Sequence, residues 1–402
     1  MAQVRPRLKV LSIFGTRPEA IKMAPLVKAL IAEPGIDSRV CITGQHQSML
    51  QQVLELFELK ADYSLNVMTP GQTLNTLTAA LYAAIDPVLE HMQPDRVLVH
   101  GDTTSAMVAA MSAFHRRIPV SHVEAGLRTG DIYQPWPEEM NRRSIDLISD
   151  QLFVPTDGSR RNVLGERLQG TSFVTGNTVI DALQLTAQRI DHNPRLRHAL
   201  DRQFNFLIPG RRVLLVTGHR RENFGDGFLN ICKALSLLAR REDLQIVYPV
   251  HLNPNVKEPV TRLLGDLPNV HLIEPLDYLS FVRLMQLAHV ILTDSGGVQE
   301  EAPSLGKPVL VMREVTERPE AVTAGTVRLV GADTDGIVQG VCALFDDDFL
   351  WRSTSKAANP YGDGRACERI VDALMGREVD EFVAHPPAGR GLLHAVTATR
   401  FH

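Results

Sequence analysis

The chain has 402 residues and a mass of 44.5 kDa, which is too long for a single ordinary domain of about 100–200 residues. Hydrophobic residues make up 44% and charged residues 22%, so the composition excludes an intrinsically disordered chain. The 42 Lys and Arg residues against 46 Asp and Glu residues give a net charge of -4 without a long basic run, so we expect no nucleic-acid partner.

Two features indicate where the protein works. Four cysteines lie far apart in apolar surroundings: Cys41, Cys232, Cys342 and Cys367. They are typical of small buried side chains in a reducing compartment, not of disulfides or a metal knuckle. The first apolar stretch is interrupted by Gly15, Arg17 and Glu19, which predicts neither a signal peptide nor a membrane span. We therefore expect a cytoplasmic protein with no membrane partner.

Short β-branched runs alternate with longer helical patterns, which is typical of βαβ units in a parallel sheet. In the first half, strands are predicted at residues 8–14, 39–43, 96–100, 120–123, 151–154 and 172–175. Helices are predicted at residues 19–32, 47–57, 74–91, 104–115, 138–149 and 178–189.

The second half repeats this pattern. Its strands are predicted at residues 212–217, 245–250, 270–273, 290–293, 308–312 and 326–330, and its helices at 229–238, 254–264, 279–287, 298–305 and 336–345. The first strand of each half runs into a similar turn, Gly15-Thr16-Arg17 in one and Gly218-His219-Arg220 in the other. We therefore predict an α/β fold of two Rossmann-like domains that face each other across an interdomain cleft.

A polar segment at residues 191–212 is the natural hinge, and we place the domain boundary near residue 176. The N-terminal domain then spans residues 1–176 and the C-terminal domain residues 177–364. A helix predicted at residues 365–375 has no strand beside it in sequence, so we expect it to return to the first domain. The tail at 377–402 is expected to be loosely ordered.

The most specific local pattern is a phosphate-binding turn after the strand at 290–293. Gly296 and Gly297 let backbone amides approach an anion, and Ser295 adds a hydroxyl. Glu301 is placed to accept hydrogen bonds from both hydroxyls of a ribose. An ordinary glycine-rich turn with a solvated glutamate is the alternative.

Two further turns share an Arg-Pro-Glu-Ala pattern that starts a helix and leaves the arginine beside its positive end. They contribute Arg17 and Arg318, and Lys22 follows Arg17 by five positions. These three cations predict a clamp for a diphosphate. For each arginine alone, pairing with a surface carboxylate is the better explanation.

Carboxylates at strand ends predict proton transfer. Asp102 and Glu124 follow neighbouring strands, and the loop before residue 138 brings Glu138 over the same mouth. Glu138 or its neighbour Glu139 has an alternative role as a simple helix-start residue. His219 faces the predicted cleft and is a donor to a phosphate, whereas a lone strand-end histidine such as His251 is usually structural.

Absent motifs narrow the chemistry. The sequence has no GxGxxG, no GxxxxGK[ST] and no HExxH, which argues against nicotinamide chemistry, P-loop phosphoryl transfer and a metal site. A nucleoside-diphosphate ligand between two domains, with several acids and one histidine, indicates nucleotide-sugar chemistry without a cofactor.

Six segments together carry a family resemblance: FGTRPEAIK at 14–22, GDTT at 101–104, HVEAGLRT at 122–129, PWPEEMNR at 135–142, GHRREN at 218–223 and DSGGVQEE at 294–301. In this order they resemble the non-hydrolysing UDP-N-acetylglucosamine 2-epimerases, over roughly residues 8–375. The resemblance implies the two-domain GT-B fold, a homodimer, and interconversion of UDP-GlcNAc and UDP-ManNAc for bacterial surface polysaccharide.

The resemblance also implies roles for single residues. UDP leaves as the C2 proton is removed, and a 2-acetamidoglucal is reprotonated from the other face before UDP adds back. The acid and base groups are then the carboxylates of Asp102, Glu124 and Glu138. His219 holds the departing diphosphate. UDP is held by Arg17, Lys22, Ser295, Gly296, Gly297, Glu301 and Arg318, and the uracil lies beside the backbone near Leu276 and Phe281. Asp102, Glu124 and His219 also touch the substrate.

One segment, at residues 43–50, departs from the pattern of many relatives, which bind a second UDP-GlcNAc there as an activator. Activation by substrate is expected here too. Three rival functions stay open: a hydrolysing relative that releases ManNAc and UDP, a GT-B glycosyltransferase, and a sensor that binds UDP-GlcNAc without turnover. Three carboxylates near a leaving diphosphate argue against the sensor, because like charges repel.

Overall fold

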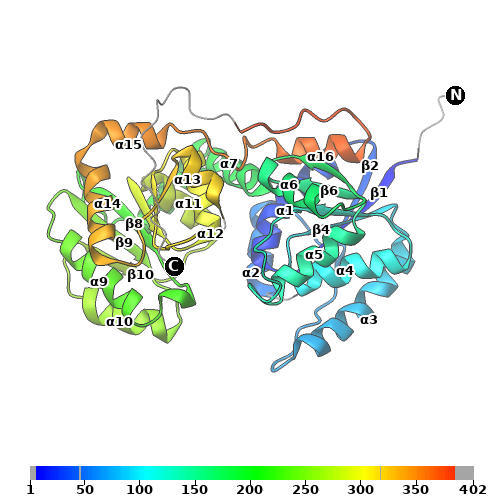
Figure 1. Ribbon diagram of the computed structural model, residues 1–402, viewed down its shortest axis with the longest axis horizontal. Coiled ribbons are helices and arrows are strands. Elements are labelled where there is room, and N and C mark those ends of the chain that lie inside the picture. The colour runs from blue at the N-terminus through cyan, green and yellow to red at the C-terminus, as the bar shows by residue number, and fades with distance from the viewer. Residues whose placement is uncertain (1–5, 45–46, 317, 385–402) are drawn as a thin grey trace, which may run out of the picture.

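The computed structural model describes residues 6–44, 47–316 and 318–384, and within them the chain forms two lobes, each built on one parallel sheet (Figure 1). The predicted α/β fold with two Rossmann-like domains is confirmed. No helix in these ranges is long and apolar enough to cross a membrane.

The first lobe holds a seven-stranded sheet in the order β3-β2-β1-β4-β5-β6-β7. Its strands are β1 (Leu8–Phe14), β2 (Ile36–Ile42), β3 (Tyr63–Ser64), β4 (Arg96–His100), β5 (Val120–Val123), β6 (Gln151–Val154) and β7 (Thr171–Val174). Its helices are α1 (Arg17–Ala32), α2 (Gln47–Leu56), α3 (Leu74–Met92), α4 (Thr104–His115), α5 (Glu138–Ile148) and α6 (Asp157–Gly165). The central strands β1, β4, β5 and β6 are largely buried, so helices must cover both faces of the sheet to exclude water.

The second lobe holds a six-stranded sheet in the order β10-β9-β8-β11-β12-β13. Its strands are β8 (Arg212–Thr217), β9 (Leu244–Pro249), β10 (Val270–Ile273), β11 (Val290–Thr293), β12 (Val309–Val311) and β13 (Val327–Leu329). Its helices are α9 (Asp226–Leu238), α10 (Pro254–Leu264), α11 (Tyr278–Leu287), α12 (Gly296–Glu301), α13 (Pro319–Ala324), α14 (Thr334–Asp346) and α15 (Asp348–Ser355), with short 3₁₀ turns at Arg221–Asn223 and Ala302–Leu305.

The strand order reverses once in each sheet, beside β1 in the first and beside β8 in the second. Ligands of parallel α/β sheets bind where this reversal opens a crevice beyond the carboxyl ends of the strands. In the first sheet the turns after β1 and β4 meet there, and in the second sheet those after β8 and β11. Every catalytic candidate from the sequence except Glu138 lies on one of these turns or on the turn after β5.

Several elements differ from the sequence prediction. The segment at 191–212, interpreted as an irregular hinge, contains helix α8 (Pro194–Gln203), which is polar and buries only Leu200. Strand β3 has two residues, and α6 and α15 are short polar helices, so none shows a clear apolar period. The helix predicted at 298–305 begins at Gly296 and continues as a 3₁₀ turn after Glu301.

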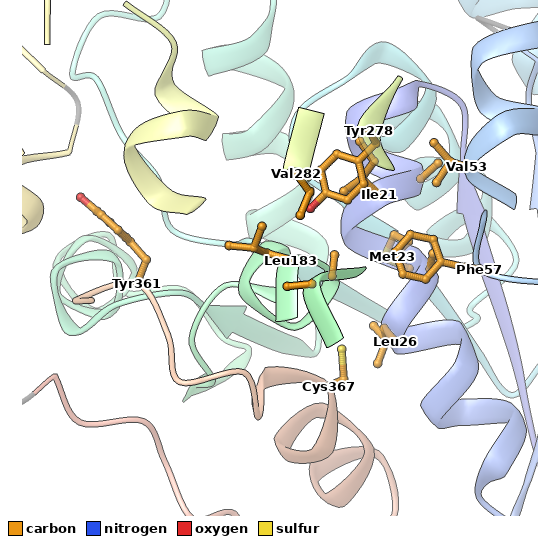
Figure 2. Close-up of a cluster of buried hydrophobic side chains, with 14 of the residues drawn as sticks. Ile21, Met23, Leu26, Val53, Phe57, Leu183, Tyr278, Val282, Tyr361 and Cys367 are labelled. Carbon is orange, nitrogen blue, oxygen red and sulfur yellow. The ribbon is translucent and has the colours of Figure 1, made fainter. Parts of the chain in front are cut away.

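The two lobes share one apolar cluster. Helix α7 (Thr178–Asp191) packs against α1 of the first lobe and against α11 of the second. Figure 2 shows Ile21 of α1, Leu183 of α7 and Val282 of α11 in this cluster. Burial of such side chains contributes about 1.5–3 kcal/mol each. The contact between the lobes is therefore a continuous core around α7.

The C-terminal segment returns to the first lobe. Helix α16 (Ala366–Leu374) packs on α1 and α7, and Figure 1 shows it among first-lobe elements. Residues 377–384, expected to be loosely ordered, make specific contacts instead. Arg377 pairs with Glu33 at 2.8 Å, and the Phe382 amide donates to the Val174 carbonyl at 2.8 Å. The rest of the tail, 385–402, lies outside the described residues.

Candidate functional site

The turn after β1 places two predicted cations. Thr16 and Glu19 form a capping box, which starts α1 at Arg17 and fixes the direction of its first turn. Lys22, one turn further along, points at the end of β5 and forms an ion pair with Glu124. Its ammonium also lies 4.0 Å from a carboxylate of the other lobe, that of Glu300. Lys22 is thus held by carboxylates on both sides.

Glu124 occupies an uncommon backbone conformation, with φ at 66°. A side chain at this φ costs about 1–2 kcal/mol, so the surrounding contacts must hold it there. Its Oε1 accepts a hydrogen bond from Asn177 Nδ2 at 2.8 Å, and its Oε2 lies 3.4 Å from His100 Nε2. Burial favours the neutral acid, but Lys22 outweighs it and holds the pKa of Glu124 well below its ordinary value.

His100, which the sequence analysis did not assign, lies fully inside this cluster. Burial lowers its pKa to about 3, so the ring is neutral at physiological pH. Neither ring nitrogen has a hydrogen-bond partner within the described part of the chain.

Helix α5 carries one of the two remaining acids and binds the other. Asp102 forms an ion pair with Arg142, and its carbonyl accepts a hydrogen bond from Asn141 Nδ2 at 2.9 Å. Glu138 is the first residue of this helix, and its Oε2 is buried without a hydrogen-bond partner among the described residues. Glu139 is fully buried, and its Oε2 accepts from Arg142 Nη1 at 3.2 Å, whereas its Oε1, like Glu138 Oε2, has no hydrogen-bond partner among the described residues.

In the second lobe, Asp294 ties together the turns after β8 and β11. Its buried carboxylate accepts from the amides of His219 and Arg220, each at 2.9 Å, and from Asn223 Nδ2 at 3.2 Å. The His219 ring is 44% exposed and stacks on His251 with 5.5 Å between ring centres. Burial of part of the ring lowers the pKa of His219.

The predicted phosphate turn carries a cation. Ser295 precedes α12, and the Arg318 guanidinium lies directly over Gly296. A Cβ on Gly296 would approach Arg318 Nη1 to 2.6 Å, so any larger residue there would displace the guanidinium. Arg318 Nε donates to Glu300 Oε1 at 2.7 Å. The structure thus brings together Ser295, Gly296 and Arg318, which the sequence placed on two separate turns.

Glu301 is also buried, but its surroundings differ. Its Oε1 accepts from the Tyr278 hydroxyl at 2.8 Å, and a Cβ on Gly297 would lie 3.8 Å from its Oε2. Burial raises the pKa of Glu301 to about 7. One oxygen is therefore engaged by Tyr278, while the other faces the glycine turn.

The residues expected beside the uracil lie at the start of α11. Leu276 precedes this helix and Phe281 lies within it, and both side chains are half-buried against the shared apolar cluster. The segment at 43–50 is described only in part, because Gln45 and His46 lie outside the described residues.

Four residues in this region were missed by the sequence analysis: His100, Asn177, Tyr278 and Glu300. Asn177 and Tyr278 have a local signal, since Asn177 caps α7 and Tyr278 opens α11. Glu300 was noted only as a neighbour of Glu301. Across the described ranges, no group of three or more His, Cys, Asp or Glu is arranged to hold a metal ion.

The fold and these turns define a class. Two parallel α/β sheets, each with polar strand-end turns at its point of reversal and joined by crossing helices, form a protein of the two-domain GT-B-like type.

Comparisons with known proteins give the family. The family model described as UDP-N-acetylglucosamine 2-epimerase matches residues 28–375. The chain is 55% identical to UDP-N-acetylglucosamine 2-epimerase of Escherichia coli strain K12 over 374 residues, which cover 92% of this chain and 100% of that protein. The chain therefore belongs to the UDP-N-acetylglucosamine 2-epimerase family.

Solved structures agree. The UDP-GlcNAc 2-epimerase from Neisseria meningitidis bound to UDP-GlcNAc superposes with a TM-score of 0.86 at 49% identity, covering 92% of this chain and 100% of that one. The Methanocaldococcus jannaschii enzyme in complex with UDP-GlcNAc and UDP gives a TM-score of 0.76 at 34% identity, with coverage of 92% and 100%.

Proposed function

We propose that this protein is a non-hydrolysing UDP-GlcNAc 2-epimerase, which interconverts UDP-GlcNAc and UDP-ManNAc and supplies ManNAc units for bacterial surface polysaccharide. The observation that carries the proposal is the similarity to epimerases over their whole length, together with the predicted acids at the strand ends. The proposed reaction uses the side chains of these residues and no cofactor.

UDP binds, in this proposal, across the two lobes. Ser295, Gly296 and Gly297 offer backbone and hydroxyl donors to the diphosphate, and Arg17, Lys22 and Arg318 supply positive charge. The ionised carboxylate of Glu301 accepts from the ribose hydroxyls, and the backbone near Leu276 and Phe281 meets the uracil. The position of Arg318 over Gly296 supports this assignment, because it places charge at the turn.

The reaction is elimination followed by addition. A carboxylate takes the C2 proton while the bond between C1 and the diphosphate oxygen breaks, and a C1=C2 double bond forms. The glycal is reprotonated at C2 from the other face, and UDP adds back to C1. Asp102, Glu124 and Glu138 are the acid and base groups, and His219 donates to the departing diphosphate.

A measurement in D₂O tests this function. Proton and phosphorus NMR spectra of UDP-GlcNAc are followed with purified protein, without added nicotinamide or metal. UDP-ManNAc with deuterium at C2 is expected. Free UDP with ManNAc would identify the hydrolysing relative instead, and an unchanged spectrum would favour the glycosyltransferase or the sensor.

We also propose a homodimer that is activated by UDP-GlcNAc at a second site. The epimerisation rate is then sigmoidal in UDP-GlcNAc concentration, and UDP-ManNAc alone is not turned over. A hyperbolic rate curve with turnover of UDP-ManNAc alone would refute the activation, and a monomer in solution by light scattering would refute the dimer.

A further inference from the structure

Asn177 stands where the chain first crosses between the lobes. Its amide N–H donates to the Tyr361 carbonyl at 2.7 Å, which joins it to the second crossing near residues 359–362. Gly176 before it packs so closely on Gly362 that a Cβ would lie 3.2 Å from the Gly362 Cα. Asn177 is 3% exposed, so its side chain has no access to bulk water.

The orientation of the Asn177 amide is fixed by the helix that it starts. Its Oδ1 accepts from the Val179 amide at 3.0 Å as the N-cap of α7. The Nδ2 group must therefore point away from α7. It donates to Glu124 Oε1 at 2.8 Å and to Glu300 Oε2 at 3.2 Å. One amide group thus touches a carboxylate from each lobe.

These two carboxylates need donors, because both are largely buried and carry the same charge. Lys22 pairs with Glu124 and lies 4.0 Å from Glu300, and Arg318 donates to Glu300 at 2.7 Å. Asn177 is the uncharged donor that bridges them in the described ranges. It fixes the carboxylate positions relative to each other without adding charge.

We propose that Asn177 is a positioning residue that holds the catalytic carboxylate Glu124 in register with Glu300 of the nucleotide-binding lobe. Glu300 lies on α12, directly after the phosphate turn, and is bonded to Arg318. A shift of that lobe on nucleotide binding therefore reaches Glu124 through the Asn177 amide, which hydrogen-bonds both carboxylates, in addition to the charge contact through Lys22. This inference rests on the proposed function, since it takes Glu124 as a proton-transfer group.

The isosteric variant Asn177→Asp gives the sharpest test. It keeps the N-cap, but places a third carboxylate against Glu124 and Glu300, with Lys22 and Arg318 as the nearby cations and the neutral His100 ring beside Glu124. We expect C2 deuterium incorporation at pH 8 to fall about tenfold or more. Activity is expected to recover partly as the pH falls, because the introduced carboxyl group, once protonated, donates a hydrogen bond as the amide did.

Asn177→Ser is the matched second variant. Serine keeps the cap but removes the Nδ2 donor. The kcat is expected to fall about tenfold at every pH without recovery in acid, while the affinity for UDP measured by calorimetry stays within about threefold. Asn193→Asp is the control, since Asn193 is the exposed N-cap of α8 and makes no hydrogen bond to a carboxylate of the described residues. It should behave as the parent does.

Three outcomes decide the inference, with folding of each variant checked by circular dichroism. Wild-type kcat and pH profile in both Asn177 variants would overturn it. Loss in Asn177→Asp without recovery in acid, together with normal activity in Asn177→Ser, would also overturn it, since that pattern reflects only an added charge. If the parent protein itself shows no C2 exchange, the proposed function is refuted, and the role of Asn177 with it.

Discussion

Glu124 and Glu301 are both buried glutamates near strand-end turns, yet they differ in charge. Lys22 holds the pKa of Glu124 well below its ordinary value although burial acts against it. Among the described residues, Glu301 accepts a hydrogen bond from the Tyr278 hydroxyl but forms no ion pair, and burial raises its pKa to about 7. The comparison teaches that burial alone does not set the charge of a carboxylate, because the nearest cation decides the outcome.

This difference in charge matches the proposed roles of the two residues, proton transfer for Glu124 and ribose binding for Glu301. Glu124 stays ionised across the physiological range, as a group that removes a proton from carbon must. Glu301 gains its full charge only above about pH 7, so its affinity for hydroxyl donors changes near neutrality.

Removing the cation should make Glu124 resemble Glu301. In Lys22→Met, breaking the buried pair should cost about 3–5 kcal/mol of unfolding free energy, and epimerisation should fall more than about 100-fold. The folded-state pKa of Glu124 then rises above its unfolded value. Stability of the variant should therefore fall as the pH rises from about 4.5 toward 8.

Urea denaturation at several pH values between 5 and 8 measures this effect. Since Glu124 of the parent is already ionised over this window, the variant should lose stability relative to the parent as the pH rises. A constant difference between the two proteins would show that Glu124 stays ionised without Lys22, which contradicts the comparison.

A substitution of Glu138 tests whether this residue takes part in proton transfer, as proposed for Glu124. If it belongs with Glu124 in the chemistry, Glu138→Gln should lower kcat by about 100-fold or more and leave UDP binding within a few-fold. Glu139→Gln is the matched control, because Glu139 is its buried neighbour paired with Arg142. That control should lower thermal stability. Equal loss of turnover and UDP affinity in Glu138→Gln would remove the catalytic assignment.

Titration of Glu301 should appear in binding. Because the charged form accepts from the ribose, UDP affinity measured by calorimetry should rise with pH through about 7. The contribution of Glu301 to the free energy of unfolding changes in the opposite direction with pH. Because its folded-state pKa is raised, this contribution is fully present below about pH 4.5 and is lost as the pH rises toward 7.

Tyr278→Phe removes the hydrogen bond that favours the charged form of Glu301. The midpoint of the binding titration should move to higher pH, and UDP should bind about 3- to 10-fold more weakly at pH 7. With 2′-deoxy-UDP the variant and the parent should differ less, because one hydroxyl donor is missing. An equal difference with both nucleotides would mean that Glu301 does not contact the 2′-hydroxyl.

The smallest effect is expected at an exposed pair. Arg377 lowers the pKa of Glu33 through a hydrogen bond at the surface. Solvent screens such pairs, so Arg377→Ala should leave epimerisation unchanged and shift the melting temperature less than any change above. A larger shift than that of Lys22→Met would reverse the ranking of buried and exposed cations.

The sequence predicted the framework well because its strands are buried and its helices have a clear apolar face. Strand β4 and helix α4 have the predicted bounds, 96–100 and 104–115. Helix α8 was missed because it buries only Leu200, so its polar pattern did not differ from that of a loop. Elements with little buried surface leave no period to detect.

The sequence indicated which site residues lie at strand ends, but not which of them contact one another. The turns that carry Asp102, Glu124 and Gly296 follow from the strand boundaries. The partner of Lys22 does not, because Glu124 lies 102 positions away and the contact depends on how helix α1 packs beside the end of β5 within the first lobe. Asn177 shows the same limit, since its bond to Glu300 spans 123 positions.

The return of α16 to the first lobe has a consequence for biosynthesis. This helix covers α1, yet the ribosome makes it only after the whole second sheet. The surface of α1 that α16 buries therefore stays exposed to water until translation passes residue 374. A chain truncated before α16 would contain every strand of both sheets but would leave α1 exposed, so the first lobe, although made first, is completed last.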